Sequence, residues 1–337
     1  MIVSRTPFRV TLGGGGTDLP SYYEKHGGMI FAMALNKYMY VNLNRPVADD
    51  LVRLHYTQSE QVANVSELKH ELAREALKLH GIHSGIEIAS LADIPAGTGV
   101  GSSSCYLVGL LNAIRQYKRD YCSLQHLAEE ACHIELDILK KNIGKQDQYM
   151  AAFGGLTFLE IAKEGKVKVE SVNLSESAMI DLIANTHIYY TGVRRNTEEI
   201  LQEQHQAMQQ VHSAQQTVSE SLHFIKDLGY RIMDAIKSEN FDAWGNMLHE
   251  HWVAKKKLSN KISLSHVDKL YEEVRAHYHV LGGKIIGAGG GGFFMLYCTQ
   301  QHRELEAFMR QQGMSRLHYQ ISTIGSTVVS DFVTRSV

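Results

Sequence analysis

The sequence contains few cysteines, and their spacing fits none of the usual cysteine sites. It has four in 337 residues, and no two of them form a CxxC pair. Their positions are Cys105, Cys122, Cys132 and Cys298. This irregular spacing argues against a disulfide framework and against a zinc knuckle. We therefore expect the protein to work in the reducing environment of the cytoplasm.

Long apolar runs and an excess of one charge are also missing. Every apolar run is interrupted well before the ~18 residues that a membrane span requires, so no span is predicted. Residues 1–7 carry no apolar segment behind their charge, and we expect them to begin a strand and not to form a signal peptide. The formal net charge of −2 offers no basic face for nucleic acid. Any anionic ligand must therefore be held locally.

Histidine is abundant, but no histidine metal motif is present. None of the 18 histidines belongs to an HExxH sequence, and His249 and His251 are two positions apart, so they point away from each other on a helix. A histidine metal site is therefore not expected. The basic runs Lys140–Lys141 and Lys255–Lys257 lie inside helical patterns, and we interpret them as solvated helix faces.

The length of the chain predicts two domains that share a long interface. The composition changes near residue 180, after which the pattern is rich in helix until strand-like segments return beyond residue 284. We place the domain boundary there, which gives an N-terminal domain of residues 1–180 and a C-terminal domain of residues 181–337.

The hydrophobic pattern of the first half mixes α and β elements. Residues 1–44 combine a strand, a glycine loop, a short helix and a β-rich stretch. Asn64, with Glu67 three positions later, is typical of a helix N-cap. Further helices are predicted over residues 102–118 and 123–142, and the first of these is apolar enough to be buried.

The first of three glycine clusters, Gly13–Gly16, requires an explanation. An expression linker is one alternative, but the cluster lies between the strand-like residues 8–12 and an abrupt Thr17-Asp18 pair. Glycine is needed where a neighbour approaches the backbone so closely that no Cβ fits. We therefore predict that a ligand approaches this loop.

The second cluster occupies residues 95–104 and opens directly into the helix predicted over residues 102–118. Such a loop presents unpaired N–H groups and the positive end of the helix dipole, so it should bind phosphate. It is not a P-loop, because no lysine precedes the serines, and the acid expected about twenty residues later in a dinucleotide fold is missing. A tight turn with capping serines is the alternative, but it does not explain the alternating glycines.

The third cluster, residues 287–292, lies between two apolar segments. Alone it is equally compatible with a bulged hairpin. Three clusters in one chain indicate instead that several loops converge on a polyanionic ligand whose phosphates are bound by the backbone.

The three clusters, taken in order, resemble the GHMP small-molecule kinases, a family named for galactose, homoserine, mevalonate and phosphomevalonate. The matching segments are Pro7–Val10 with the loop to Asp18, Pro95–Ser104, and Lys284–Phe294. The resemblance covers nearly the whole chain. It implies an α+β fold with an N-terminal domain like ribosomal protein S5 domain 2, a ferredoxin-like C-terminal domain, and an active site between them.

The resemblance also implies roles for residues outside the glycine clusters. Asp147 matches the aspartate that acts as general base, and Arg9 matches a basic residue near the transferred phosphoryl group. Ser103 and Glu135 match the pair that holds Mg²⁺. From the residues alone, a capping aspartate, a strand-edge arginine and a surface glutamate are the alternatives. Lys145 would lower the pKa of Asp147 if the turn brings the two together.

The remaining ligand contacts implied by the resemblance fall into two sets. The ATP phosphates are expected at Pro95, Gly97, Gly99, Gly101, Ser102, Ser103 and Ser104. The sugar is expected at Gly15, Gly16, Thr17, Asp18, Gly289 and Gly290. If the sugar carries its own phosphate, Arg194 and Arg195 are the expected cations, because an arginine fork grips phosphate well.

The activity implied is that of an ATP- and Mg²⁺-dependent kinase for the anomeric hydroxyl of a sugar. The preferred acceptor is D-glycero-D-manno-heptose 7-phosphate, which would give the 1,7-bisphosphate for the synthesis of nucleotide-activated heptose. A kinase for unphosphorylated fucose or galactose and a non-catalytic sensor of sugar and ATP are the alternatives. The expected partners are thus ATP and a sugar phosphate, without nucleic acid or membrane, and a homo-oligomer stays open.

Overall fold

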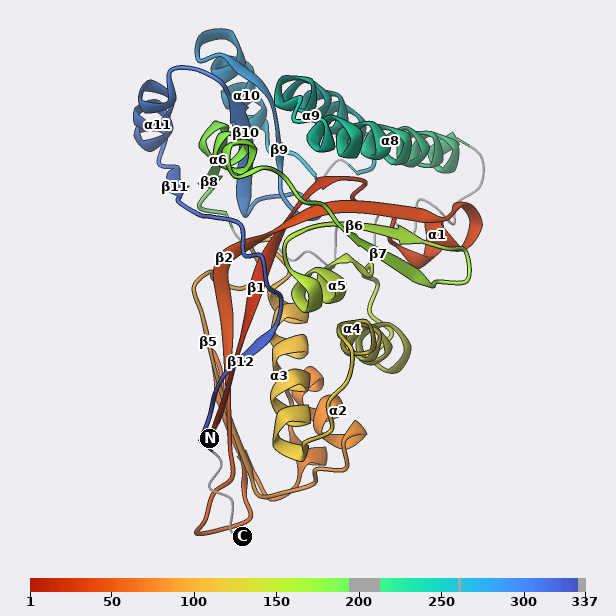
Figure 1. The fold of residues 1–337 in the computed structure, drawn as a ribbon, viewed down its shortest axis with the longest axis vertical. Coiled ribbons are helices and arrows are strands. Elements are labelled where there is room, and N and C mark those ends of the chain that lie inside the picture. Colours follow the sequence, from red (N-terminus) through yellow and green to blue (C-terminus); the bar gives the residue numbers. More distant parts are fainter. Residues whose placement is uncertain (194–212, 260–261, 333–337) are drawn as a thin grey trace.

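Residues 1–193, 213–259 and 262–332 are described by the structure, a computed structural model. Two β-sheets with their covering helices occupy the two ends of the long axis of the molecule (Figure 1). The N-terminal strands run along this axis and reach the second half at their upper ends. The two halves therefore meet around the end of the first strand.

The first sheet is built on two long antiparallel strands, β1 (Ile2–Gly13) and β2 (Gly28–Asn44). Its other strands are β3 (Val52–His55), β4 (Ser59–Val62), β5 (Ile86–Ala92), β6 (Leu156–Ile161), β7 (Val167–Ser171) and β12 (Thr327–Asp331). The strand order is β12-β1-β2-β5-β3-β4, and β6 with β7 extends from the first part of β2. The second part of β1, residues 6–13, is buried on both faces, and this buried stretch includes the polar residues Arg9 and Thr11.

Helices cover one face of this sheet. They are α1 (Pro20–His26), a 3₁₀ turn (Val65–Glu67), α2 (Glu71–Leu79), α3 (Ser102–Lys118), α4 (Leu124–Cys132), a π-helical segment (His133–Ile138) and α5 (Gln146–Phe153). The buried helix α3 lies along β1, where the Ser4 hydroxyl donates a hydrogen bond of 2.7 Å to the carbonyl of Gly109. A side chain at Gly109 would lie 2.8 Å from Thr6 Oγ1, so glycine permits this close approach.

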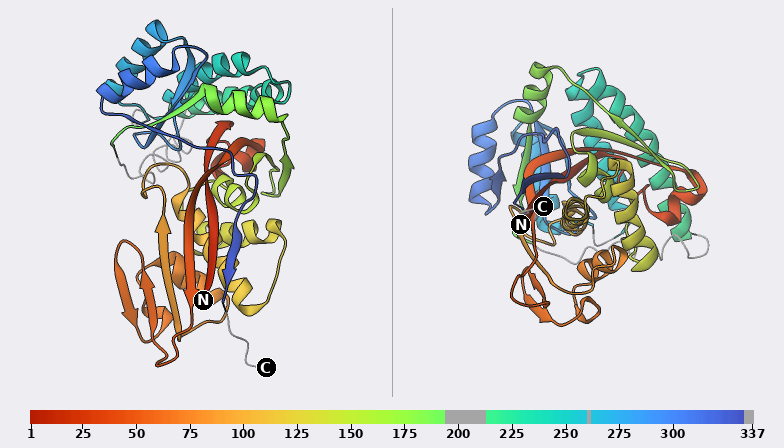
Figure 2. Two further views of the ribbon diagram at one scale, coloured as in Figure 1. Left: turned by 60° about the vertical axis from the view of Figure 1, so that its left-hand side comes forward. Right: turned by 60° about the horizontal axis from the view of Figure 1, so that its bottom comes forward.

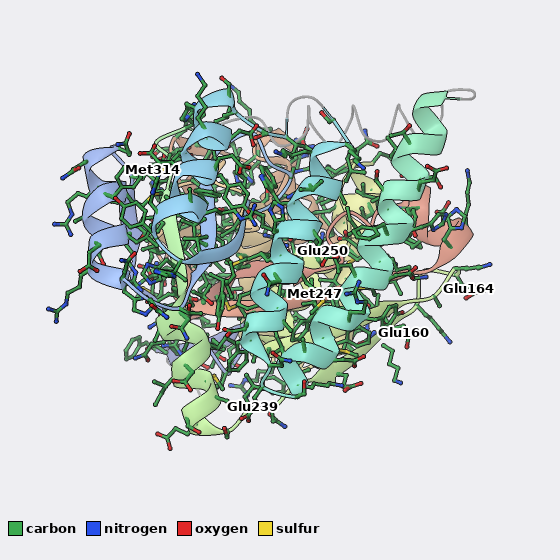
Figure 3. The ribbon with its side chains drawn as sticks, turned by 90° about the horizontal axis from the view of Figure 1, so that it is seen from above. Glu160, Glu164, Glu239, Met247, Glu250 and Met314 are labelled. Atoms are coloured by element: carbon green, nitrogen blue, oxygen red, sulfur yellow. The ribbon has the colours of Figure 1, made fainter. Side chains whose placement is uncertain are left out.

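The second sheet has the order β11-β8-β10-β9. Its strands are β8 (Thr186–Tyr190), β9 (Val280–Ile285), β10 (Phe293–Cys298) and β11 (Ser315–Leu317). The surrounding helices are α6 (Glu176–Asn185), α8 (Ser213–Lys237), α9 (Phe241–Lys256), α10 (Ser265–His277) and α11 (His302–Gln311). Seen from above, α8 and α9 lie side by side, with Met247 and Glu250 on α9 (Figure 3).

The last described strand returns to the first sheet. After β11 the chain runs back along the molecule, and β12 pairs antiparallel with β1 (Figure 2). Residues 327–331 therefore contribute to the sheet of the N-terminal half, although they lie in the segment predicted as the C-terminal domain. The boundary near residue 180 itself stays a prediction.

Several predicted elements differ in detail from those in the structure. The helix over residues 102–118 is confirmed as α3. The helix predicted over 123–142 ends as an α-helix at Cys132 and continues only as the short π-helical segment. Asn64 does form a capping box with Glu67, but it caps the 3₁₀ turn, whereas α2 begins later.

The close packing of α9 on β9 generates a stability prediction. A Cβ at Gly282 would lie 2.0 Å from the carbonyl oxygen of Gly245, so neither backbone can yield without moving α9 from the sheet. We expect Gly282→Ala to lower the free energy of unfolding by ~1–3 kcal/mol, the usual cost of overpacking. Denaturant unfolding measures this. Gly313→Asn is the control, since that glycine follows α11 in open space, where asparagine is tolerated; an equal loss in both variants would contradict the prediction.

Candidate active site

A cavity of about 360 Å³ lies where the two halves of the molecule meet. The N-terminal half contributes the end of β1, the Gly13–Gly16 loop, the loop before α3 and the start of α5. The C-terminal half contributes α9, β9 and the beginning of the loop after β9. Of the predicted site residues, the cavity is lined by Arg9, Gly15, Gly16, Asp18, Gly97, Gly99, Gly101, Ser102, Ser103, Ser104, Glu135 and Asp147.

The loop before α3 has the geometry of an anion site. Gly97, Gly99 and Gly101 have φ angles of +77°, +78° and +83°, which other residues adopt only with strain. Gly101 is the N-cap of α3, so the free N–H groups of the first helical turn begin at the cavity. The predicted contact at Pro95 is not supported, because this residue is exposed and does not line the cavity.

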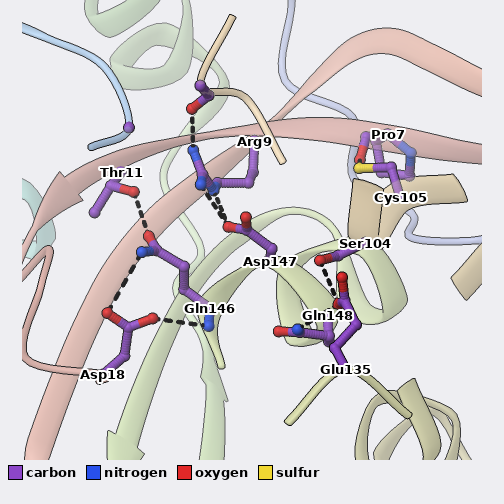
Figure 4. Close-up of polar contacts among 12 residues, drawn as sticks. Pro7, Arg9, Thr11, Asp18, Ser104, Cys105, Glu135, Gln146, Asp147 and Gln148 are labelled. Carbon is purple, nitrogen blue, oxygen red and sulfur yellow. Dashed lines mark hydrogen bonds and ion pairs between the residues drawn. The ribbon is translucent and has the colours of Figure 1, made fainter. Parts of the chain in front are cut away.

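The buried Arg9 and the partly exposed Asp147 form an ion pair inside the cavity (Figure 4). The Nε and Nη2 atoms of Arg9 lie 2.6 and 2.5 Å from the same oxygen, Oδ1 of Asp147. Arg9 Nη1 donates a further hydrogen bond of 2.7 Å to the carbonyl of Gly99 in the phosphate loop. One guanidinium thus connects β1, the first turn of α5 and the loop before α3.

Lys145 does not take the place expected for it. Its Nζ donates a hydrogen bond of 2.6 Å to the carbonyl of Gly165 and lies 5.3 Å from the centre of the Tyr23 ring. The condition under which Lys145 would act on Asp147 is therefore not met, and Arg9 supplies the positive charge beside that carboxylate. Sequence proximity was misleading here, because the two side chains leave the turn in different directions.

Glu135 is fully buried and held by Ser104, not by Ser103. The Ser104 hydroxyl and the Gln148 side-chain amide donate hydrogen bonds of 2.7 and 2.6 Å to Oε2 of Glu135 (Figure 4). Oε1 has no hydrogen-bond partner among the described residues. Burial raises the pKa of Glu135, and the two hydrogen bonds oppose this rise. Ser103 is exposed and lines the cavity from the start of α3.

Asp18 is held in place by the start of α5. Its carboxylate accepts hydrogen bonds from the backbone N–H of Gln146 at 3.1 Å and from the side-chain amide of Gln146 at 3.4 Å. The Thr11 hydroxyl donates a hydrogen bond to the side-chain carbonyl oxygen of Gln146. A Cβ at Gly144 would lie 1.9 Å from the Asp18 carboxylate, so only glycine leaves room for it. Burial is the main cause that raises the pKa of Asp18 to about 6.

Other predicted sugar contacts lie outside the cavity. The Thr17 hydroxyl lies 2.8 and 2.7 Å from the carbonyl oxygens of Gly14 and Met29, which compete for its one proton, and it accepts a hydrogen bond of 3.0 Å from the N–H of Met29, so it fixes the shape of the glycine loop. Gly290 donates its N–H to the carbonyl of Ile262, and a Cβ at Gly289 would meet the same oxygen. These contacts give the three residues structural roles.

The third glycine cluster reaches the site in a different way from the one predicted. Gly287 and Ala288, and not Gly289 or Gly290, line the cavity. A Cβ at Gly287 would lie 2.5 Å from the carbonyl oxygen of Gly99, so this cluster packs against the phosphate loop. Arg194 and Arg195 lie outside the described residues.

Sequence reasoning missed four basic residues of the cavity. Lys141 was predicted on a solvated helix face, but it lies outside a helix, is half-buried and lines the cavity from the N-terminal half. The other three come from the C-terminal half. His251 and Lys255 lie on α9 and Lys284 on β9, and all three are buried. Lys255 was predicted on a solvated helix face, and its burial corrects that prediction. A signal was present, because Trp244, Leu248, His251 and Lys255 recur at positions i, i+4, i+7 and i+11, which lie on one face of a helix.

Two family models match the chain, one in each half of the molecule. The GHMP kinase N-terminal domain matches residues 65–155, which include the phosphate loop, Glu135 and Asp147. The GHMP kinase C-terminal model matches residues 232–313, which include α9 and β9. The chain belongs to the GHMP kinase family.

Relatives of this GHMP kinase include several sugar kinases. A D-glycero-alpha-D-manno-heptose 7-phosphate kinase from Campylobacter jejuni is 26% identical over 93% of this chain and 94% of its own length. A solved D-glycero-D-manno-heptose 1-phosphate kinase from Bacteroides thetaiotaomicron has a TM-score of 0.81 at 21% identity, over 98% of this chain and 100% of that one. An L-fucokinase/L-fucose-1-P guanylyltransferase from Bacteroides fragilis is 25% identical over 88% of this chain, which spans 34% of that longer protein.

The family assignment settles the class of fold and of activity. The predicted α+β GHMP kinase fold is confirmed by the two matched domains and by the structural neighbour. This GHMP kinase is an enzyme, a sugar kinase that transfers phosphate from ATP to a hydroxyl group. Within the described residues, no helix has the length and apolar character of a membrane span.

The burial of Asp18 predicts a pH-dependent effect on stability. Its pKa rises from 3.8 to about 6 on folding, so the native state binds this proton more tightly than the unfolded chain. The resulting stabilisation is present below about pH 4 and is lost as the pH rises through about 6. A shift of about two pKa units corresponds to ~3 kcal/mol.

Asp18→Asn removes this titration. We expect the stability of the variant, relative to the unchanged protein, to increase by ~2 kcal/mol between about pH 4.5 and about pH 7.5. Denaturant unfolding of both proteins at the two pH values tests this. Asp181→Asn, at an exposed position of α6, is the matched control. A difference that does not change with pH would show that Asp18 titrates normally.

Proposed function

We propose that the enzyme phosphorylates the anomeric hydroxyl of D-glycero-D-manno-heptose 7-phosphate and so gives the 1,7-bisphosphate. We place this reaction in the cytoplasm, where its product would serve the synthesis of nucleotide-activated heptose. The observation that carries this proposal is the Arg9–Asp147 pair, which lies in one cavity with the phosphate loop and with Asp18. We infer the heptose acceptor from the name of the relative in Campylobacter jejuni, which matches the chain almost end to end.

Asp147 has the surroundings of a general base. Both contacts from Arg9 engage Oδ1, which leaves Oδ2 to accept the proton of the sugar hydroxyl. The Arg9 guanidinium also faces the phosphate loop through Gly99, so its charge offsets the negative charge that develops on the transferred phosphoryl group. These contacts support the roles expected for both residues.

Asp18 is suited to hold the sugar. It lies beside Gly15 and Gly16 on the cavity wall, and its carboxylate is anchored to Gln146, the neighbour of the base. With a pKa of about 6 it is largely ionised at neutral pH and accepts hydrogen bonds from sugar hydroxyls. The first turn of α5 thus holds both Asp18, the proposed sugar ligand, and Asp147, the proposed base.

The cavity also fits a Mg²⁺ ion, held by Glu135 and Ser103. Oε1 of Glu135 is buried without a partner, as expected for a ligand that lacks its ion. The described residues contain no group of three or more His, Cys, Asp and Glu side chains suited to a metal. Mg²⁺ accepts such a sparse site, because it takes one or two protein oxygens and completes its shell with water and phosphate. When bound, the ion neutralises charge on the ATP phosphates.

A panel of sugars tests the proposed acceptor. Sugar-dependent release of ADP is measured with heptose 7-phosphate, with the same heptose lacking the phosphate, and with fucose and galactose. We expect kcat/KM for the phosphorylated sugar to exceed that for each free sugar by about tenfold or more, because a phosphate adds charge-assisted hydrogen bonds. A free sugar that is used as well or better would favour the fucokinase-like alternative suggested by the Bacteroides fragilis relative.

Asp147→Asn shows whether that activity belongs to this site. Removal of the proton acceptor should lower kcat by ~10²–10⁴-fold while ATP still binds. Asp137→Asn, on the neighbouring exposed surface, is the control and should keep its turnover. Retention of most activity by Asp147→Asn would exclude the residue as the base.

The proposed metal ligands are tested by the Mg²⁺ dependence of the activity. Glu135→Gln and Ser103→Ala should each raise the Mg²⁺ concentration needed for half-maximal activity by about tenfold, a usual effect of disturbing a metal site. Ser104→Ala is the informative comparison, since Ser104 contacts Glu135 directly and Ser103 does not. A shift in Ser104→Ala alone would transfer the ligand role to Ser104, and no shift in any variant would refute the site.

A further inference from the structure

Three basic side chains line the cavity from the C-terminal half and are almost inaccessible. The exposed fractions of His251, Lys255 and Lys284 are 1%, 7% and 2%. His251 and Lys255 lie one helical turn apart on α9, and Lys284 lies on β9, against which α9 packs. All three line the same cavity as Asp147 and the phosphate loop.

None of the three has a carboxylate partner among the described residues. Lys255 Nζ donates to the carbonyl oxygens of Ile285, at 3.2 Å, and of Gly287. Lys284 Nζ donates to the carbonyl oxygen of Leu12 at 3.2 Å. Both ring nitrogens of His251 lack a hydrogen-bond partner. Three buried nitrogen groups that face a cavity without a counter-charge are costly unless a ligand completes them.

The other charged groups nearby do not supply that counter-charge. Arg9 on β1 acts on both lysines, but it carries the same charge and is already paired with Asp147. On the far side of α9, the contact with α8 includes an exposed ion pair of Arg231 and Glu250. The other charged groups of the cavity are Asp18, Glu135 and Lys141, and none of them contacts the three basic residues. No side chain of the described residues therefore supplies the counter-charge, and an anionic ligand in the cavity would do so.

We propose that His251, Lys255 and Lys284 form a binding site for a terminal phosphate dianion, separate from the N-terminus of α3, and that this site takes up a proton together with its ligand. The proposal deepens the proposed function, because the site belongs to the same cavity. It names a class of group and not the particular sugar, so it can be tested without turnover.

The position of the site admits two sources for the phosphate. The carbonyl held by Lys284 belongs to Leu12, directly before the glycine loop that lines the sugar side of the cavity. The carbonyl held by Lys255 belongs to Gly287, which packs on Gly99 of the phosphate loop. A phosphate carried by the sugar and the terminal phosphate of ATP are both within the chemistry of such a site.

Proton uptake follows from the state of the empty site. Burial lowers the pKa of Lys255 to about 7 and the pKa values of Lys284 and His251 further below their ordinary ranges. A bound dianion favours the charged forms and raises these pKa values again. Above about pH 7 the empty site is largely neutral, so the ligand must bring protons with it. Well below that pH, Lys255 is already charged and its share of the uptake disappears.

Calorimetry in buffers of different ionisation enthalpy measures both affinity and proton uptake. Two matched ligand pairs are compared at a fixed Mg²⁺ concentration, namely heptose 7-phosphate with heptose, and a non-hydrolysable ATP analogue with ADP. At about pH 8, where phosphate monoesters are dianions, we expect one member of a pair to bind with uptake of about one proton or more that its partner without the phosphate does not show.

The variants Lys255→Met and Lys284→Met test whether these two lysines bind the phosphate. Each should weaken binding of that phosphate-bearing ligand by about tenfold or more and reduce its proton uptake. Lys257→Met, at the exposed end of the same helix, is the matched control and should change neither. Thermal unfolding without ligand shows that the variants are folded.

The outcomes separate the two sources and the two proposals. An effect confined to heptose 7-phosphate assigns the site to the sugar, and one confined to the ATP analogue assigns it to the transferred phosphate. The absence of proton uptake by the unchanged protein with either ligand would overturn the proposal even if a variant did not fold. Unchanged affinities in both folded lysine variants would overturn it as well. Failure of heptose 7-phosphate as a substrate would leave the ATP arm decisive, so the two proposals fail independently.

Discussion

The buried guanidinium of Arg9 is the contact on which the rest of the active site depends. It is 4% exposed and joins the carboxylate of Asp147 to the carbonyl of Gly99, so residues from three distant parts of the chain share one charged group. Loss of Asp147 would leave the buried charge of Arg9 without its partner. The orientation of Asp147, the proposed general base, and the conformation of the loop before α3 are therefore coupled, because the same side chain holds both.

Backbone contacts between glycines complete this arrangement across the two halves of the molecule. A Cβ at Gly99 would lie 2.9 Å from the carbonyl oxygen of Ile286, and one at Gly292 would lie 2.2 Å from that of Thr98. The third glycine cluster is thus needed mainly to let the C-terminal half press against the phosphate loop. Convergence of the glycine clusters was a sound prediction, but the physical reason is that one loop supports another, and only part of the third touches the cavity.

The sequence indicated which residues lie together in the cavity where the motif and the local structure agree. Asp147 lies in the first turn of a helix, and the loop before α3, which was predicted to bind phosphate, lines the cavity with three glycines in the left-handed region. The sequence did not allow contacts between distant side chains to be predicted. Which serine meets Glu135 depends on the rotation of α3 about its axis, and whether Lys255 is buried depends on how α9 lies on β9. The return of β12 to the first sheet had no local signal, since pairing with β1 is decided by tertiary packing.

The burial that raises the pKa values of Asp18 and Glu135 also lowers those of Lys255 and Lys284, so the empty cavity disfavours charge of either sign. The two signs are nevertheless separated in space. The carboxylates come from the N-terminal half together with Arg9 and Lys141, whereas the C-terminal half contributes only the basic residues His251, Lys255 and Lys284. A phosphate placed toward the lysines of α9 and β9 and a divalent cation placed toward Glu135 would each restore the charge that burial suppresses. Ligands of opposite charge would thus supply the counter-charges that the described residues lack.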